Sequence, residues 1–186
     1  DKEVRLWDAA TGEPMGKPLD RHRGPVNCVV LGEVDGRAVV VSGSDDKEVR
    51  LWDAATGEPM GKPLDRHRGP VHSIALGEVD GRAVVVSGSS DQTIRLWDAV
   101  TGEPIGEPLA AHNRLVYSVP LGELDGRAVV VSGSDDKTVR LWEAASGRLL
   151  LIADLRRRAT AVSSLRNGNL AIGQTRGVAL FNLALK

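Results

Sequence analysis

The stretch WDAATGEP occupies residues 7–14 and recurs unchanged at residues 52–59, 45 positions later. Residues 1–26 and 46–71 are identical, and related stretches around Trp97 and Trp142 continue the same spacing. A fixed period of this length, with one tryptophan followed by an acidic residue in each unit, indicates a tandem repeat of small β-sheets. Arrays of this kind usually present a surface to a partner, so the sequence favours a binding protein over an enzyme.

Each unit divides into four segments separated by turn residues. In the second full unit, residues 69–76 and 82–88 are apolar strands joined by an Asp-Gly pair that suits a tight hairpin. Residues 93–98 alternate in polarity, which is typical of a third strand. Residues 103–110 contain two prolines, and proline fits only an edge strand. We therefore expect a meander of four antiparallel strands, which we name a, b, c and d in chain order.

Composition excludes several classes of function. The chain has 186 residues, enough to bury a core, and its formal net charge is −1. This net charge gives no electrostatic attraction to nucleic acid or to an anionic membrane. No apolar run approaches the roughly 20 residues that span a bilayer, and no signal peptide opens the chain. We expect a cytoplasmic protein that binds neither nucleic acid nor membrane, in which the single Cys28 packs as a small core residue.

The repeats resemble the WD-repeat (WD-40, transducin β-type) β-propeller family. RLWD or RLWE occurs four times, and SGSDD or a near relative precedes it wherever the chain extends that far. The resemblance covers essentially the whole chain, strongly to about residue 143. It implies an all-β fold, an incomplete propeller of about four to five four-stranded antiparallel blades. In amino-acid sequence, the repeats most resemble those of actinobacterial proteins in which the blades follow a signalling NTPase or another effector domain.

The strand count predicts one propeller region, residues 1–186, that is truncated at its N-terminus. A partial blade (strands c and d, 1–20) is followed by blades at 21–65, 66–110 and 111–155, and by a degenerate C-terminal blade (strands a to c, 156–186). Phe181 replaces the tryptophan in this last blade. Because an open array leaves unpaired strand edges, self-association through those edges is one expected consequence.

The resemblance also implies a hydrogen-bonded tetrad in each complete blade. Its members are tryptophan on strand c, serine on strand b, histidine before strand a, and aspartate in the b–c turn. Carried over by position, the tetrads are His22, Ser42, Asp46 and Trp52; His67, Ser87, Asp91 and Trp97; and His112, Ser132, Asp136 and Trp142. Buried indole, hydroxyl and imidazole groups need such partners, so we expect a structural role.

Serine, histidine and aspartate also suggest a hydrolase, but a catalytic triad occurs once, in one pocket. Here the set recurs in every blade with a tryptophan, so we expect no catalytic residue. The spacing of the histidines and the one cysteine gives no metal site. The SGSDDK segments lack a phosphate-binding loop, so no cofactor is expected. We expect His72 to lie on the rim and Arg156–Arg158 to lie on a solvated blade edge.

Topology predicts which turns share a face. In an antiparallel meander the b–c and d–a turns lie at one end of each blade, and the a–b and c–d turns lie at the other. The resemblance implies that partners bind the first of these ends, whose alternating charges suit a protein-recognition rim. The residues expected on this partner-binding face are Arg21, Arg23, Asp45, Lys47, Arg66, Arg68, Ser90 and Gln92.

The sequence thus predicts a non-catalytic scaffold or sensor module of a larger bacterial signalling protein, with a protein or peptide partner. One alternative is an accessory region of an enzyme polypeptide (an NTPase, kinase or peptidase) whose catalytic domain lies upstream of residue 1. Another is an architectural module that closes by self-association. A catalytic motif upstream of Asp1 would distinguish the enzyme from the other two.

Overall fold

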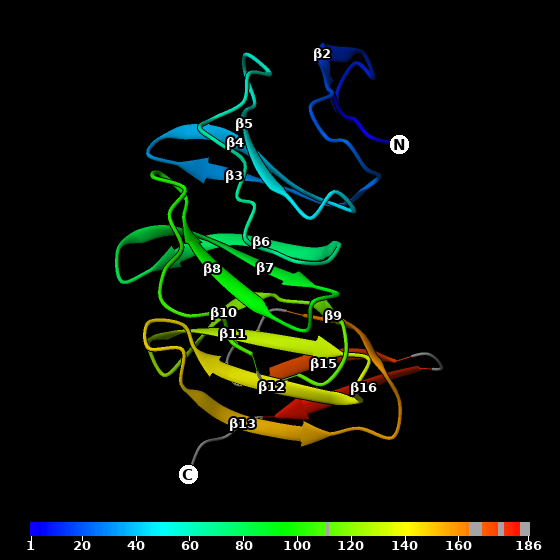
Figure 1. The fold of residues 1–186 in the computed structure, drawn as a ribbon, viewed down its shortest axis with the longest axis vertical. Helices are drawn as coiled ribbons and strands as arrows, with labels where there is room; N and C mark the ends of the chain where they lie inside the picture. The colour runs from blue at the N-terminus through cyan, green and yellow to red at the C-terminus, as the bar shows by residue number, and fades with distance from the viewer. Residues whose placement is uncertain (111, 164–168, 175–176, 183–186) are drawn as a thin grey trace.

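The computed structural model describes residues 1–110, 112–163, 169–174 and 177–182, and every regular element in them is a β-strand. Figure 1 shows the strands as small twisted sheets that follow one another along the long axis of the molecule. They run from the N-terminus at the top of the view towards β13 at the bottom. Within the described ranges no helix is long and apolar enough to cross a membrane.

Five antiparallel sheets follow in chain order, and we name them the partial blade, the first, second and third blades, and the terminal blade. The partial blade contains β1 (Val4–Trp7) and β2 (Pro14–Leu19). The first blade contains β3 (Val26–Val34), β4 (Arg37–Ser44) and β5 (Val49–Asp53). The second contains β6 (Val71–Val79), β7 (Arg82–Ser89) and β8 (Ile94–Asp98). The third contains β9 (Val116–Ser118), β10 (Leu121–Leu124), β11 (Arg127–Ser134), β12 (Thr138–Glu143) and β13 (Leu149–Asp154). The terminal blade contains β14 (Ala159–Val162), β15 (Asn169–Gln174) and β16 (Gly177–Asn182).

Asp-Gly hairpins connect strands a and b. Asp80 has a φ of 50° and Gly81 a φ of 76°, and the same pair of angles recurs in the other two complete blades. Two consecutive positive φ angles are those of a type I′ turn, whose twist matches the flanking strands. Glycine and aspartate tolerate this conformation, so the turn residues themselves fix the register of each hairpin.

The outer segment of the first and second blades is attached to strand c at its two ends only. In the first blade, isolated bridges join Val49 to Leu64 and Trp52 to Pro59. Gly61 lies between the bridges with a φ of 72°. Proline lacks the N–H that a continuous ladder needs, which explains the interruption. The third blade has neither proline nor glycine in this segment, and its β13 pairs along β12 as a regular strand.

The core lies between blades and not within a single sheet. Leu51 of the first blade packs in one buried cluster with Val85 and Trp97 of the second. Along the inner strands, Leu76 fills the space over Gly32, where a Cβ atom would lie 2.7 Å from its Cδ2 atom. Each blade is therefore stabilised by its neighbours, as expected for a repeat array.

Among the described residues, the outward face of the terminal blade is uncovered. On β16, Val178 is 72% exposed and Leu180 is 82% exposed. By strand register, Val178 corresponds to Val49 of the first blade, because each pairs with a glycine on strand b. Val49 is fully buried, since the second blade covers it. The described residues thus form an open, incomplete propeller of antiparallel sheets, and the predicted fold class is confirmed.

Candidate functional site

Four buried side chains of the second blade form a continuous chain of hydrogen bonds. The indole Nε1 of Trp97 donates to Ser87 Oγ at 2.9 Å, and His67 Nε2 lies 2.8 Å from the same oxygen. His67 Nδ1 lies 2.9 Å from Asp91 Oδ2. An ionised carboxylate only accepts, so Nδ1 carries the proton and Nε2 accepts from the serine hydroxyl. Strands c and b therefore supply the first two groups, and the d–a linker and the b–c turn supply the others.

The first and third blades contain the same arrangement at the residues that the resemblance named. The Nδ1–carboxylate distance is 2.8 Å in both, for His22 with Asp46 and for His112 with Asp136. The Nε2–Oγ distances are 2.7 and 2.8 Å, and both Nε1–Oγ distances are 2.9 Å. The terminal blade lacks the serine, because buried Ile172 occupies its register on strand b. The side chain of Phe181 lies outside the described residues.

The tetrad aspartate also binds the backbone of the two segments that it joins. In the second blade, Asp91 accepts from the backbone N–H of Arg68 at 2.8 Å and of Thr93 at 3.0 Å. Gly69 completes this contact, since a Cβ atom there would lie 2.9 Å from the Asp91 nitrogen. The d–a linker and the b–c turn are consequently held together as one surface.

Electrostatics fix the protonation states of the histidine and the aspartate in the third-blade tetrad. Burial alone would raise the pKa of Asp136, but hydrogen bonds from Thr138 and His112 outweigh burial and lower that pKa to about 2. Burial lowers the pKa of His112, although Asp136 opposes the shift. The carboxylate is therefore ionised and the imidazole neutral at physiological pH.

Hydrolytic chemistry does not fit these sites. Serine, histidine and aspartate stand in the order and at the distances of a nucleophile, base and orienting acid. However, the tetrad serines Ser42, Ser87 and Ser132 are 0% exposed, and each already accepts a hydrogen bond from an indole. A substrate cannot reach an oxygen that is buried under a tryptophan, so the arrangement acts as a clamp.

One tetrad lies beside a further acidic residue that sequence spacing did not reveal. The ligand atoms of His22, Asp46 and Glu48 lie within 4.8 Å of one another, a separation that a metal ion could bridge. Both His22 nitrogens are already hydrogen-bonded, and Glu48 accepts from Arg50 at 2.7 Å. The three groups are thus engaged by protein partners, and we assign no metal to them.

The residues expected on the partner-binding face lie on the d–a linkers and the b–c turns. All of these residues are exposed except Ser90, which is half-buried. The residues are Arg21, Arg23, Asp45, Lys47, Arg66, Arg68, Ser90 and Gln92. Asp45 accepts from Asn27 Nδ2 at 2.7 Å, and Ser90 Oγ lies 2.7 Å from His72 Nε2. The structure therefore brings each b–c turn against the start of strand a in its own blade.

His72 lies at a junction of two blades and does more than occupy the rim. Its ring centroid is 6.1 Å from that of Tyr117 in the third blade. Asn27, His72 and Tyr117 occupy the same position in successive repeats, and this correspondence is the signal that the sequence offered.

The three arginines Arg156–Arg158 are all exposed. The Nε atom of Arg158 lies 3.2 Å from a carboxylate oxygen of Asp135 in the third blade.

The b–c turns hold long side chains in an unusual backbone conformation. Lys47, Gln92 and Lys137 have φ angles of 75°, 72° and 68°. This left-handed conformation costs a residue with a Cβ roughly 1–2 kcal/mol, whereas glycine adopts it freely. All three side chains are exposed on the same face as the d–a linkers.

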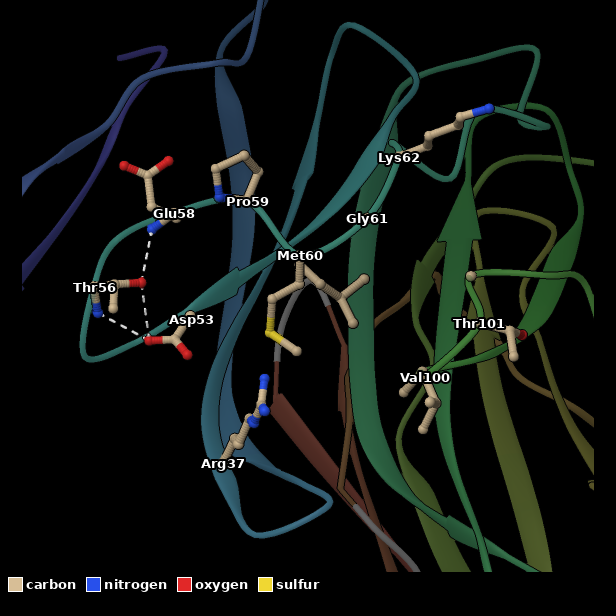
Figure 2. Close-up of a pocket in the computed structure, with 13 residues that line it drawn as sticks. Arg37, Asp53, Thr56, Glu58, Pro59, Met60, Gly61, Lys62, Val100 and Thr101 are labelled. Atoms are coloured by element: carbon tan, nitrogen blue, oxygen red, sulfur yellow. Dashed lines mark hydrogen bonds between the residues drawn. The ribbon is translucent and has the colours of Figure 1, made fainter.

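On the opposite face, a shallow hollow of about 430 Å³ lies between the first and second blades. Figure 2 shows Arg37 reaching from the a–b hairpin towards Met60 on the outer segment, with Val100 on the neighbouring blade. Asp53 holds the c–d turn beside this hollow, accepting from the Thr56 N–H at 2.8 Å. The hollow is open, and Asp53 and Thr56 hydrogen-bond within the c–d turn, so it does not form an enclosed site.

Comparisons with known proteins agree with this fold. The family described as "WD40: WD domain, G-beta repeat" matches residues 12–53, 57–98 and 102–143. Curated proteins give no match to this chain.

Three solved structures share the architecture at 24% sequence identity. The computationally designed Ika8 protein has a TM-score of 0.81, with 98% of this chain covering 53% of that one. The designed Ika4 protein has a TM-score of 0.78, with 94% covering 100%. The WD40 β-propeller domain of Doa1 has a TM-score of 0.77, with 96% covering 56%. The chain thus spans about half the length of Ika8 and of the Doa1 domain, and this likeness concerns the fold alone. WD40 propellers generally serve as protein-interaction scaffolds. Because three repeats match the family and the blades have the expected topology, this chain belongs to the WD40 family.

Proposed function

We propose that this chain is a non-catalytic protein-binding scaffold or sensor module, and that it engages a protein or peptide through the face formed by the b–c and d–a turns. The observation that carries this proposal is the clamp between the two segments. Asp91 binds the backbone of the d–a linker and of its own turn, at Arg68 and Thr93. Neighbouring charged side chains are therefore presented on a preformed surface, which lowers the entropic cost of binding.

The backbone of the b–c turns supports the same assignment. Lys47, Gln92 and Lys137 hold a conformation that glycine would adopt without strain. Strain at an exposed position is consistent with a requirement for the side chain itself. The proposal also places the chain in a larger, cytoplasmic signalling protein of bacterial origin, because the amino-acid sequence of the repeats resembles that of such proteins.

Charge reversal tests the choice of face. Arg23→Glu combined with Arg68→Glu should weaken the capture of partners from a native lysate, because both side chains are exposed on the proposed surface. The matched control reverses Asp35 and Asp80 to lysine in the hairpins of the opposite face. Circular dichroism should show unchanged folding in both variants. If the hairpin variant loses capture and the arginine variant keeps it, the assigned face is wrong.

A further inference from the structure

Three consecutive arginines, Arg156–Arg158, precede the first strand of the terminal blade, and all three are exposed. They belong to the d–a linker between β13 and β14, so they lie on the same face as the b–c turns. The linker is attached to the b–c turn of the third blade, because the Leu155 N–H donates to the Lys137 carbonyl at 2.7 Å. The positive charges of the linker and of this turn are therefore gathered at one place on the face.

The terminal blade uses this linker differently from the complete blades. In the second blade the linker contains His67, which is buried because the tetrad holds it against Ser87. The terminal blade has Ile172 at the register of that serine, and its linker contains arginines and no histidine. A segment that supplies a structural side chain elsewhere in the array thus presents three charged side chains to solvent here.

A single carboxylate serves two of the arginines around this turn. Asp135 Oδ1 lies 3.2 Å from Arg158 Nε, and its Oδ2 lies 3.4 Å from Nη1 of Arg114 in the preceding d–a linker. The Asp135 side chain is 16% exposed, whereas those of Arg158 and Arg114 are 48% and 68% exposed. One sheltered negative charge therefore lies between two outward guanidinium groups, and it neutralises at most one of them.

The other cations at this junction have no counterion of their own. Arg156, Arg157 and Lys137 form no ion pair with another described residue. Of the neighbouring acids, Asp136 is held in the tetrad, which leaves Asp154 as the exposed one. Positive charge is consequently in excess here. We call this set the basic patch; its members are Arg114, Lys137, Arg156, Arg157 and Arg158.

The opposite face has the reverse charge. Each a–b hairpin of the complete blades contains two acidic residues and one arginine, as in Glu78, Asp80 and Arg82. Because the formal net charge of the chain is −1, the basic patch is a local feature and not part of a generally cationic surface. Such a patch attracts a short acidic segment to one place, whereas the acidic residues elsewhere repel a long polyanion.

We propose that the basic patch is the docking site for a short segment of the protein partner that is rich in aspartate and glutamate. The contacts of Asp135 with Arg114 and Arg158 show that these guanidinium groups accommodate a carboxylate between them. Arginine suits this role, because its planar guanidinium matches the geometry of a carboxylate. Exposed ion pairs contribute little to stability, so carboxylates of the partner can replace or extend them at small cost. This inference rests on the proposed function and adds the chemistry of the partner.

Fluorescence anisotropy with a labelled hexaglutamate peptide tests the patch in the full chain, with hexaglutamine as the neutral probe. We expect hexaglutamate to bind at low ionic strength and hexaglutamine not to bind. Arg156→Glu combined with Arg157→Glu should weaken binding about tenfold or more, because two attractions become repulsions. Arg37→Glu combined with Arg82→Glu is the matched control. It changes the net charge equally on the opposite face, and should alter binding by less than about twofold.

Asp135→Asn is a second test, because it should improve the site. Arg114 and Arg158 lose the carboxylate that they share and become available to the peptide. Hexaglutamate should then bind about two- to fivefold more tightly, the range that an exposed ion pair contributes. Circular dichroism of each variant checks that the fold is unchanged.

Several results would overturn the docking site. Hexaglutamate that does not bind the unaltered chain, or that binds equally well after reversal of Arg156 and Arg157, contradicts it. So does an Asp135→Asn variant that binds no more tightly. A labelled oligothymidylate that binds more tightly through the same arginines would assign the patch to nucleic acid. Self-association at low salt that the reversal abolishes would assign it to the acidic face of a second copy.

Capture of native partners separates this inference from the proposed function. If capture is lost on reversal of Arg23 and Arg68 but is insensitive to reversal of Arg156 and Arg157, the docking site alone is wrong. If capture is insensitive to both pairs of changes, the proposed face and the docking site are both wrong.

Discussion

In the second blade, the Nε2 atom of His67 lies 2.8 Å from the Oγ atom of Ser87, and both side chains are buried. The serine oxygen is the centre of the tetrad, because it also accepts from Trp97. A single hydroxyl therefore satisfies two large buried groups that come from different segments of the blade.

Removing this hydroxyl should destabilise the protein. We expect Ser87→Ala to lower the free energy of unfolding by about 1–3 kcal/mol, because two buried polar groups lose their partner. Trp97→Ala should cost more, about 3–5 kcal/mol, the range for truncating a large buried aromatic side chain. Urea unfolding measures both changes. A neutral Ser87→Ala variant would contradict the structural role of the tetrad.

Acid should destabilise the fold in two ranges of pH. The unfolded chain protonates His112 below pH about 6.5, whereas the folded pKa of this residue is lowered, so stability falls as the pH drops through that value. Asp136 stabilises the fold above its unfolded pKa of about 3.9, and this contribution is lost as the pH falls towards the folded value of about 2. Urea unfolding between pH 8 and pH 2 checks both ranges. The Asp136→Asn variant should be less stable at neutral pH and lose less stability below pH 4.

Cys28 occupies a position at which serine joins two blades elsewhere in the chain. Ser73 accepts from the Val119 N–H at 3.1 Å, and Ser118 accepts from the Val162 N–H at 3.0 Å. We expect Cys28→Ser to form the equivalent bond with Ile74 and to stabilise the protein by about 0.5–1.5 kcal/mol.

The reverse change, Ser73→Cys, is the matched control and should cost a similar free energy of unfolding. If the two substitutions shift stability in the same direction, the hydrogen bond is not the cause. In the unaltered chain, burial raises the pKa of the Cys28 thiol to about 12. Alkylation of the native protein at neutral pH should consequently be slow.

Gln92→Gly should stabilise the protein by up to about 1 kcal/mol. The φ angle of 72° strains any residue with a Cβ, and the relief exceeds the entropy lost on ordering glycine. Gln92→Ala, which keeps the Cβ, should leave stability nearly unchanged. Thermal unfolding of the two variants separates backbone strain from the effect of the side chain. A glycine variant that is no more stable than the alanine variant would disprove the strain.

Much of the architecture could be predicted because the repeat is so regular. The spacing of Trp52, Trp97 and Trp142 indicated one sheet per unit, and the Asp-Gly pairs indicated hairpins. A meander then has only one way to distribute its turns between two ends. The tetrad residues named from the resemblance are those whose side chains hydrogen-bond in the structure. That match follows from position, since the same register recurs in each blade.

Features that depend on contacts between blades were not predictable from one unit. The outer segments bridge strand c only at their ends, because Gly61 and the prolines interrupt the ladder. The contact of His72 with Tyr117 joins residues that lie one repeat apart. Neither of these relationships is encoded in a local pattern of polarity.

The contact between His72 and Tyr117 has a consequence for how the chain finds its fold. Segments copied almost without change are interchangeable, so a strand could pair within the wrong repeat and leave a long-lived misassembled intermediate. The few positions that differ are concentrated at the start of strand a, where Asn27 in one repeat is His72 in the next. Such differences discriminate against incorrect neighbours, because a misplaced strand cannot form the ring contact. A His72→Asn variant, which makes these two positions alike, should therefore refold with a larger slow phase than the unaltered chain.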